Sequence, residues 1–481
     1  MNAVVEQALG SGWRLDFGAW DAGQAARQRA VPARDAEGRL WLLADRERDA
    51  ALAALLEARL GCRLRWLRCD VGALDAWLRE GEAGYRALAG MAEGEADSGA
   101  GDATLRELSL EQLASATSPA VRLLDAVLYD ALQDGASDIH VESDPAGAQI
   151  RLRVDGVMQP VRRIDGRPLG EQVVSRLKVL AELDIGERRL PQDGRFRLRV
   201  GARDVDFRLS IMPTAHGEDA VVRVLDRGGS GGAEGLTLAA LGYDEPTAAL
   251  LLAQARQPHG MLLVTGPTGS GKTTTLYAAI LQTRGSHDKI VTIEDPVEYR
   301  LAGVAQIPVN ERQGLSFARG LRSVLRHDPD RIMVGEIRDA ETAQIAVQAA
   351  LTGHLVFSTV HANGALEVVG RFMHMGLDLY HVVTALNLVV AQRLMRQRCD
   401  ACGGAGCAAC RGSGYRGRRA IAEVLQLDDE LRDLIASRAP MARLKQAARE
   451  RGLVPLHEVA RAAVRAGWTT QEEFERVTLA A

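Results

Sequence analysis

The chain has 481 residues, a length for which about three domains are expected. Its 59 lysines and arginines nearly balance its 63 aspartates and glutamates, and the net charge of −4 argues against a protein that binds nucleic acid. No apolar run approaches the roughly 20 residues that span a bilayer, and the N-terminus lacks the basic start and apolar core of a secretory signal. These features predict a cytosolic protein whose cysteines stay reduced.

Residues 1–90 are expected to form a small N-terminal domain, because five of the six tryptophans lie among the first 77 residues. An acidic, glycine-rich stretch at 90–102 has nothing to bury and is typical of a linker. Residues 105–226 then alternate between helical spacing and period-two strand patterns, which indicates a second domain of mixed helices and strands. The glycine-rich segment 226–235 predicts a flexible joint after that domain.

The region 236–396 carries the most informative motif, GPTGSGKT at 266–273. An apolar strand leads into it and a helix-forming stretch follows, which is the context of a phosphate-binding loop. Its glycines allow backbone N–H groups to surround a triphosphate at the positive end of the new helix. We expect Lys272 to reach the β- and γ-phosphates and Thr273 to hold Mg²⁺. The residues expected to bind the nucleotide are Gly266, Pro267, Thr268, Gly269, Ser270, Gly271, Lys272, Thr273 and Thr274.

Alternating strand and helix patterns around this motif favour a parallel sheet, and open α/β sheets bind ligands at their carboxyl edge. One apolar strand ends in Gly335-Glu336, so Glu336 is expected to polarise the attacking water or to coordinate Mg²⁺ through water. Another strand is followed by Glu294, Asp295 and Glu298, which could tune Mg²⁺ or orient water. A plain polar loop is the alternative for any one of these three acids.

Two histidines, His354 and His361, flank the short apolar strand LVFSTV. A neutral imidazole can sense a γ-phosphate or pass on a hydrogen bond, while a satisfied core histidine is the alternative. His361 is the better candidate for catalysis because it stands at the polar exit of the strand.

The four cysteines at Cys399, Cys402, Cys407 and Cys410 form two C-x-x-C pairs, each the start of a C-x-x-C-x-G-x-G unit, and the two units follow each other directly. Four thiolates within twelve residues suit one tetrahedral Zn²⁺, and a closed four-sulfur site is structural rather than catalytic. A metal-free loop is the alternative. We expect residues 397–418 to form a zinc element and 419–481 to form a helical C-terminal region.

Arginines recur on the strand-like stretches of the second domain, at Arg195, Arg208 and Arg223. Planar guanidinium groups suit phosphate, and an arginine delivered by a neighbouring domain can neutralise charge in a transition state. Ordinary solvated strand faces in an arginine-rich chain explain each residue, taken alone, equally well.

Taken together, these motifs resemble those of the secretion-superfamily traffic ATPases, most closely the type II secretion ATPases. Strings similar to that family's second N-terminal domain are ASDIHVE, SRLKVLAELDIGERRLPQDGRF and RLSIMPTAHGEDAVVRVL. Strings similar to its ATPase and C-terminal motifs are GPTGSGKT, IEDPVEY, LRHDPDRIMVGEIRDAET, TGHLVFSTVHAN and GWTTQEEFERVT. The resemblance covers about residues 105–481, and the first 90 residues match only loosely.

The resemblance implies an α/β fold: a RecA-like P-loop ATPase domain preceded by a PAS-like α+β domain. It implies a homo-hexamer that uses ATP, Mg²⁺ and Zn²⁺, with ATP held between the two large domains of each subunit. Glu336 corresponds to the catalytic glutamate, and Arg208 and Arg223 correspond to arginines that reach the nucleotide. Further residues expected at the site or at subunit interfaces are His361, Glu294, Arg322, Arg326, Arg338 and Arg371.

The implied role is to drive pseudopilus assembly and protein export from the cytoplasmic side of the inner membrane. The chain would attach there peripherally, through platform proteins that residues 1–90 recruit. One departure from the family is the short spacing of the cysteine pairs, since only GGAG intervenes where a much longer insertion is usual.

Three alternatives remain open at this point. A type IV pilus extension ATPase shares the cysteines and the long N-terminal region, whereas pilus retraction ATPases lack both. A nucleotide-gated scaffold with little turnover is disfavoured by the intact glutamate and arginines. A DNA-translocating motor is disfavoured by the balanced charge and by the lack of basic segments rich in aromatic residues.

Overall fold

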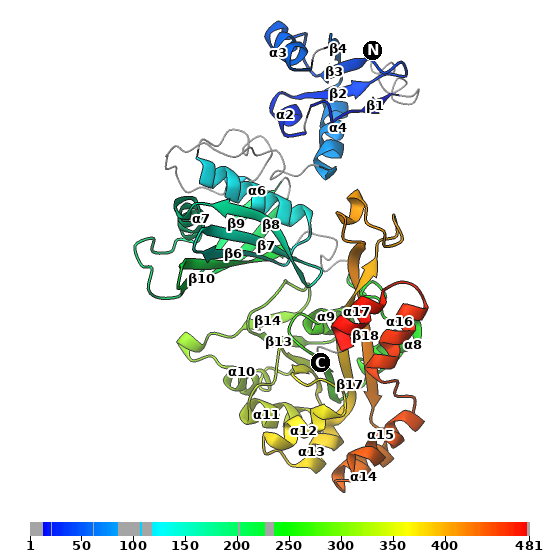
Figure 1. Cartoon of the computed structure of the whole chain (residues 1–481). Coiled ribbons are helices and arrows are strands. Elements are labelled where there is room, and N and C mark those ends of the chain that lie inside the picture. The colour runs from blue at the N-terminus through cyan, green and yellow to red at the C-terminus, as the bar shows by residue number, and fades with distance from the viewer. Residues whose placement is uncertain are drawn as a thin grey trace. The chain divides into compact units, whose positions relative to one another are not determined.

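The computed structural model describes residues 13–20, 22–60, 62–84, 106–107, 118–200, 203–226 and 235–478. Tertiary contacts divide the chain into two compact units, Met1–Gly228 and Gly229–Ala481 (Figure 1). The predicted linker at 90–102 and nearly all of the predicted joint at 226–235 lie outside the described residues. No helix among the described residues is both long and apolar enough to cross a membrane.

The N-terminal part of the first unit is a small sheet of four strands in the order β1-β2-β3-β4, with three helices. Its elements are β1 (Arg14–Leu15), α2 (Ala22–Arg27), β2 (Ala30–Arg34), β3 (Leu40–Ala44), α3 (Ala50–Leu60), β4 (Arg65–Arg68) and α4 (Val71–Gly84). The five early tryptophans pack in or against its two apolar clusters. They therefore belong to a core of this part of the chain.

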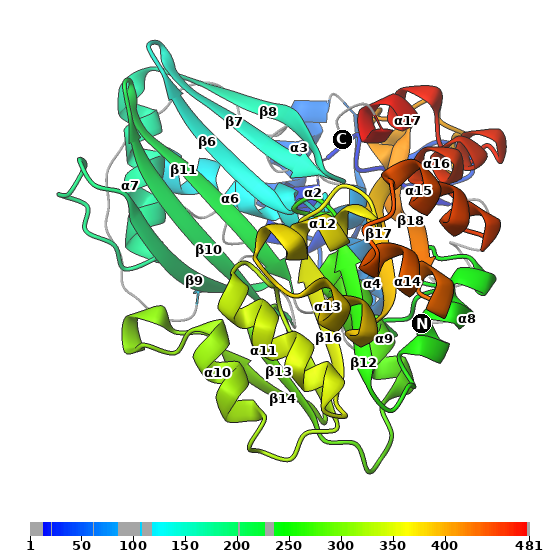
Figure 2. The same ribbon diagram turned by 90° about the horizontal axis from the view of Figure 1, so that it is seen from below.

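The second part of this unit is a seven-stranded sheet in the order β5-β9-β10-β11-β6-β7-β8. Its elements are β5 (Arg106–Glu107), α6 (Pro119–Gln133), β6 (Asp138–Asp144), β7 (Gly147–Val154), β8 (Val157–Asp165), α7 (Arg167–Leu180), β9 (Gln192–Val200), β10 (Arg203–Thr214) and β11 (Gly217–Asp226). Both helices cover one face of the sheet, where Phe207 and Leu209 of β10 are buried (Figure 2). The other face of β10 carries Arg208, because successive side chains of a strand alternate between faces.

The second unit is built on a seven-stranded sheet in the order β14-β13-β15-β16-β12-β17-β18. The pairs among its first six strands are parallel, and only β17 and β18 pair antiparallel. Its strands are β12 (Gly260–Thr265), β13 (Ile290–Glu294), β14 (Ala305–Pro308), β15 (Arg331–Val334), β16 (Leu355–Val360), β17 (Leu386–Arg398) and β18 (Tyr415–Gln426). All six residues of β12 and of β16 are buried, as expected for central parallel strands covered on both faces.

Helices cover both faces of this sheet. They are α8 (Glu245–Gln254), α9 (Lys272–Thr283), α10 (Phe317–Val324), α11 (Ala340–Leu351), α12 (Glu367–His374), α13 (Leu379–Ala385), α14 (Asp429–Ala436), α15 (Met441–Glu450), α16 (Leu456–Arg465) and α17 (Gln471–Thr478). Two short 3₁₀ turns, η2 (Glu311–Gln313) and η3 (Ala408–Cys410), lie between them. Leu262 and Val264 pack with α8 and α9 on one face, and Met261 and Leu263 pack with α10 to α15 on the other.

The predicted fold class is confirmed: a doubly wound α/β unit follows an α+β domain and a small N-terminal domain. One prediction differs from the structure. The helical region expected at 419–481 begins with a strand, because Tyr415–Gln426 pairs antiparallel with β17 as β18. The cysteines therefore lie in the turn of the β17–β18 hairpin, within the sheet of the second unit, and four helices follow it.

Candidate functional site

The phosphate loop lies between β12 and α9 and has the backbone that its glycines permit. Gly266, Gly269 and Gly271 have φ values of 144°, 77° and 82°. A Cβ on Gly266 would lie 2.4 Å from the carbonyl oxygen of Gln392, so no larger residue fits there. Among the described residues, the buried Ser270 hydroxyl has no hydrogen-bond partner. It is therefore available to a bound ligand.

Lys272 begins α9 and folds back over the loop. Its ammonium group donates to the carbonyls of Gly266 at 2.9 Å and Pro267 at 3.1 Å. Burial lowers the pKa of Lys272, and the carboxylate of Glu336 opposes that effect. Glu336 is thus close enough for its charge to affect the ammonium group of Lys272.

Glu336 lies just beyond the carboxyl end of β15, two strands from the phosphate loop. Its carboxylate pairs with the guanidinium of Arg338 and lies 3.4 Å from Nε2 of His361. The hydroxyl of Thr359 donates to the Gly335 carbonyl at 2.7 Å, which ties the loop that carries Glu336 to β16. The structure therefore brings together three predicted residues, Glu336, His361 and Arg338.

The other end of β16 holds His354, whose Nδ1 lies 3.1 Å from the Ala349 carbonyl. Six strand residues separate it from His361, a span of roughly 20 Å at 3.3 Å per residue. Its place at the opposite edge of the sheet fits the alternative of a satisfied structural histidine.

Glu294 occupies a different environment from the one predicted for a magnesium ligand. Only 2% of the residue is exposed, and its carboxylate accepts hydrogen bonds from the hydroxyls of Tyr277 and Thr292. The Gln306 amide donates to it at 3.2 Å. Glu294 thus binds interior groups of α9, β13 and β14, and its role toward the nucleotide remains a prediction. The hydroxyl of Thr274, another residue predicted to bind the nucleotide, accepts a hydrogen bond from the hydroxyl of Tyr299 at 3.5 Å.

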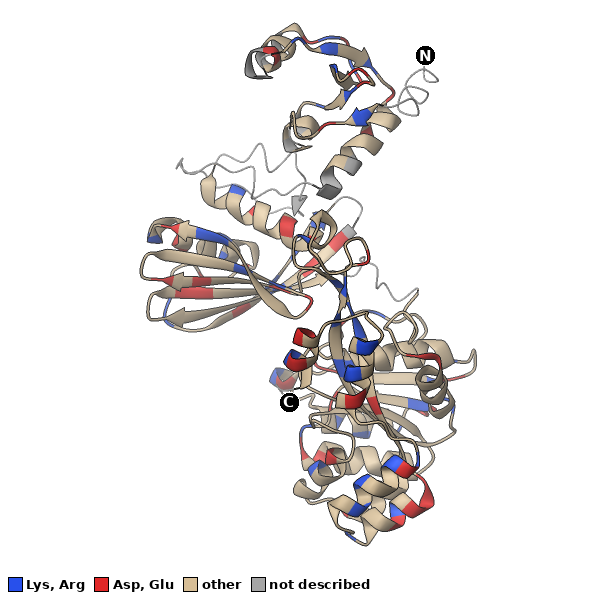
Figure 3. Cartoon of the chain, turned by 45° about the vertical axis from the view of Figure 1, so that its right-hand side comes forward, with Lys and Arg blue, Asp and Glu red and all other residues tan. Residues whose placement is uncertain are grey.

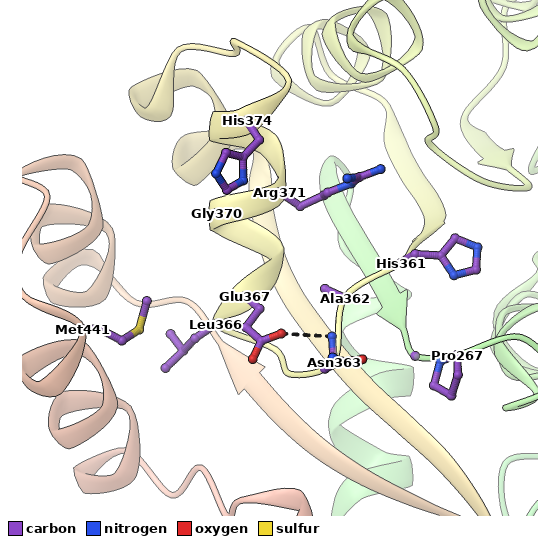
Figure 4. Close-up of a pocket in the computed structure, with 11 residues that line it drawn as sticks. Pro267, His361, Ala362, Asn363, Leu366, Glu367, Gly370, Arg371, His374 and Met441 are labelled. Carbon is purple, nitrogen blue, oxygen red and sulfur yellow. Dashed lines mark hydrogen bonds between the residues drawn. The ribbon is translucent and has the colours of Figure 1, made fainter. Parts of the chain in front are cut away.

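A cavity of about 510 Å³, within the usual range for ligand pockets, opens beside the loop (Figure 4). Gly266 and Pro267 form one side of it, and His361 lies beside them. Arg371 of α12 and Met441 of α15 line its far side, and the Asn363 N–H donates to Glu367 at 3.1 Å. Of the predicted interface arginines, Arg371 thus lies at this cavity, while Arg322 pairs with Glu341 and Arg326 donates to the Arg322 carbonyl at 2.9 Å.

Sequence reasoning missed two residues of β17 that touch the site. Arg393 is 5% exposed and donates to the carbonyls of Gln392 at 3.0 Å and Asn363 at 3.2 Å. Gln392 is 1% exposed and donates to the Ser270 carbonyl at 2.7 Å. The only signal was a Gln-Arg pair inside the apolar run LVVAQRLM.

The arginines of the second domain form a row across its open sheet face. Strand register sets Arg195 opposite Arg208, Arg208 opposite Arg223, and Arg223 opposite Asp138. Arg223 pairs with Asp138 at 2.9 Å, and 59% of the Arg223 side chain is exposed. Like charges on directly opposed residues destabilise a sheet, so this row suits an anionic ligand.

The four cysteine sulfurs lie within 4.8 Å of one another at the tip of the β17–β18 hairpin. The measured separations are 3.9 Å for Cys399 and Cys407, and 3.7 Å for Cys410 with both Cys402 and Cys407. A tetrahedral ion with sulfurs at about 2.3 Å sets them roughly 3.8 Å apart. The short cysteine spacing is therefore compatible with one zinc ion, in a hairpin flanked by arginines (Figure 3).

A phosphate loop at the carboxyl edge of a doubly wound sheet, with a carboxylate and an imidazole beside it, defines the class of P-loop nucleotide-binding proteins. Residues 114–476 match the sequence profile of the family described as type II/IV secretion system protein. That match spans most of the chain, and the chain belongs to this family.

The chain is similar to proteins named for type II secretion systems and to one named for type IV pilus assembly. Type II secretion system protein HxcR of Pseudomonas aeruginosa is 47% identical over 369 residues, covering 75% of this chain and 78% of the relative. Type II secretion system ATPase E of Vibrio cholerae is 44% identical over 387 residues, covering 75% and 76%. Type IV pilus assembly ATPase PilB of Myxococcus xanthus is 43% identical over 396 residues, covering 76% and 69%.

Solved structures agree on the fold. The pilus retraction motor PilT with bound ADP has a TM-score of 0.52 and 28% identity, covering 74% of this chain and 96% of that chain. The ATPase DotB of Legionella pneumophila has a TM-score of 0.57 and 21% identity, covering 75% and 96%. The predicted membership of the secretion ATPase superfamily is confirmed.

Proposed function

We propose that this chain is an ATP-hydrolysing motor that works as a homo-hexamer and powers pseudopilus assembly and protein export in a type II secretion system. The names of its relatives support this function. The observation that carries it is the position of Glu336, which lies between Arg338 and His361 at the sheet edge that holds the phosphate loop. A carboxylate there can accept a proton from the attacking water.

Each residue of the site has a defined task in this proposal. The loop N–H groups and Lys272 bind the β- and γ-phosphates, and Thr273 would hold Mg²⁺ through its hydroxyl. When bound, Mg²⁺ neutralises charge on the phosphates. Glu336 orients and deprotonates water, while His361 holds the Glu336 carboxylate and reports on the γ-phosphate.

The arginine row of the second domain completes the site. Arg208 and Arg223 would reach the phosphates when the second domain closes onto the ATPase domain. Charge-assisted bonds between guanidinium and phosphate are stronger than neutral hydrogen bonds, so ATP binding would favour closure. Phosphate release removes part of that stabilisation and lets the domains separate, which makes the mechanical step.

The test is Glu336→Gln in the full chain. The amide keeps the shape of the side chain but cannot act as a base, so ATP binding should stay intact while kcat falls by orders of magnitude. Phosphate release measures kcat, and titration with a fluorescent ATP analogue measures binding. Near-normal turnover of the variant would refute the role of Glu336. A wild-type chain that binds ATP but releases no phosphate, even with its membrane partner, would instead indicate a nucleotide-gated scaffold.

A type IV pilus extension motor is the second candidate, because a pilus assembly ATPase is 43% identical to this chain. Both candidates imply a cytoplasmic protein held at the inner membrane by platform proteins, with residues 1–90 as the recruiting part and zinc as a structural ion. Complementation separates them: the gene should restore export in a secretion-deficient strain and not pilus extension in a pilus-deficient one. A pull-down with the cytoplasmic domains of each platform tests the partners.

A further inference from the structure

Gln392 is a buried polar residue in the apolar strand β17, directly beneath the phosphate loop. Both atoms of its side-chain amide have partners. Nε2 donates to the Ser270 carbonyl at 2.7 Å, and Oε1 accepts from the hydroxyls of Tyr243 at 2.6 Å and Thr275 at 2.8 Å. This network joins β17, the phosphate loop, α9 and the segment that precedes α8.

The bond to the Ser270 carbonyl fixes a neighbouring N–H group as well. The carbonyl of Ser270 and the N–H of Gly271 belong to one planar, trans peptide unit, so they point in opposite directions. Holding the carbonyl inward on Gln392 therefore directs the Gly271 N–H outward, to the side where the loop receives phosphate. A Cβ on Gly271 would lie only 3.0 Å from Nε2 of Gln392, so glycine also permits this close approach.

The two hydroxyls determine which way the Gln392 amide faces. Because both donate to Oε1, the NH₂ end has to face Ser270. Tyr243 is buried, and burial raises the pKa of Tyr243, so its hydroxyl keeps the proton that it donates. The Tyr243 segment is itself held to α9, where the Leu238 N–H donates to Gln282 at 2.8 Å.

We propose that Gln392 is a positioning residue of the nucleotide site, which orients the Gly271 N–H toward phosphate and is itself oriented by Tyr243 and Thr275. This inference rests on the proposed function. It adds a second layer of residues beneath the phosphate loop, outside the motif at 266–273. It also links the segment that precedes α8 to the loop.

The experiment compares three variants of the full chain: Gln392→Leu, Tyr243→Phe and the matched control Gln282→Leu. Gln282→Leu makes the same substitution and removes a hydrogen bond to the same segment, but it does not touch the loop. Fluorescent ATP with Mg²⁺ is titrated into each variant, and steady-state hydrolysis gives KM and kcat. Amide exchange of the peptide 266–276 with and without ADP reports on the loop itself.

We expect Gln392→Leu to weaken ATP binding about tenfold or more, Tyr243→Phe about threefold, and Gln282→Leu less than twofold. KM should rise while kcat changes little, because the Gly271 N–H binds phosphate equally in ground and transition states. Nucleotide-induced protection of 266–276 should fall in the same order. A general loss of stability would instead lower kcat, because fewer molecules are folded, and would leave KM unchanged.

Two results overturn the inference. One is a folded Gln392→Leu variant whose affinity for ATP and loop protection equal those of the wild type. If that variant does not fold, Tyr243→Phe decides alone, and an affinity equal to that of the wild type rejects the proposal. A wild-type chain that does not bind ATP at all would instead reject the proposed function, so the two failures are distinguishable.

Discussion

Glu473 is a carboxylate with no exposed surface, near the C-terminal end of the chain. Its oxygens accept hydrogen bonds from the backbone N–H and the Nε of Arg396, both at 2.8 Å, and from the guanidinium of Arg476. Burial alone would raise the pKa of Glu473, but the hydrogen bonds from Arg476 and Arg396 outweigh it and lower that pKa from its usual 4.5. This one residue fixes α17 to β17.

Replacing Glu473 by glutamine should destabilise the ATPase unit by about 3 kcal/mol at pH 7, because the variant leaves buried arginine charge unpaired. The loss of stability in this variant depends on pH. The pKa of Glu473 is lower in the folded chain than in the unfolded chain. The stability that its ion pairs contribute is therefore fully present at a pH above the unfolded-state pKa, and it is lost as the pH falls through the folded-state pKa. The variant and the wild type should therefore converge in acid.

Thermal unfolding across pH 3 to 7 checks this expectation, with amide exchange of α17 as the local readout. The matched control is Glu472→Gln, which changes the neighbouring exposed residue in the same way and should shift stability by less than about 0.5 kcal/mol. An equal loss of stability in both variants would contradict the assignment.

How far the sequence predicts single residues depends on the range of their contacts. Glu336 and His361 could be predicted, because each directly follows an apolar strand and parallel strands end at the same sheet edge. Gln392 could not be, since its partner Ser270 is 122 residues away and only the fold joins them. In the sequence, Glu294 is one of several acidic residues after a strand and cannot be told apart from the others. Only its hydrogen bonds to Tyr277 and Gln306 in the fold show that its carboxylate faces the interior.

At the scale of elements, the β17–β18 hairpin pairs irregularly near its turn, where the register shifts between Arg396 and Arg398. Both flanking strands are long, and the turn that joins them contains the four cysteines. Backbone bonds close it, such as that from Cys399 N–H to the Gly414 carbonyl at 2.9 Å. Its order should depend on a bound ion, because metal binding and folding are coupled in such small sites.

Cys402→Ser should reduce bound zinc from about one ion per chain to nearly none and raise proteolytic cleavage within 399–414. Elemental analysis of freshly purified protein and limited proteolysis measure the two effects. Cys62→Ser provides the control, since Cys62 is an exposed free thiol far from the hairpin in sequence. Wild-type protein that carries no zinc would contradict the site.

The sequence indicated the cysteine knuckles but not the strand after them. The segment YRGRRAIAEVLQ lacks a clean alternation of apolar and polar residues, and it forms β18 because β17 offers it a partner over ten registered pairs. Tertiary pairing of this kind overrides local preference. The helices that follow were predictable, because each carries its apolar residues at helical spacing.

At the scale of the whole molecule, the cationic groups that the proposed function assigns to the nucleotide belong to two separate units. Lys272 belongs to the ATPase unit, and the arginine row belongs to the α+β domain of the other unit. Hydrolysis that requires both groups is coupled to any motion between the units. This arrangement is the physical reason to expect a motor and not a simple hydrolase.

Arg223→Ala in the full chain should reduce kcat/KM for ATP about ten- to a hundredfold, the value of one or two charge-assisted hydrogen bonds. Most of the Arg223 side chain is exposed, but its partner Asp138 is buried, so a loss of thermal stability is expected as well and is measured separately. Arg199→Ala is the control: Arg199 lies on the same open face, but it pairs with Asp204 at 3.1 Å in a different row. Equal loss of activity in both variants would point to general surface charge.

Because Glu473 and Arg396 join α17 to β17, the strand that also carries Gln392, a change at α17 is expected to affect the phosphate loop. A fluorescent reporter or purification tag appended beyond α17 would disturb the contacts between α17 and β17, the strand that supports the phosphate loop. Proteolytic removal of α17 would therefore lower turnover and would not be a harmless heterogeneity of the sample.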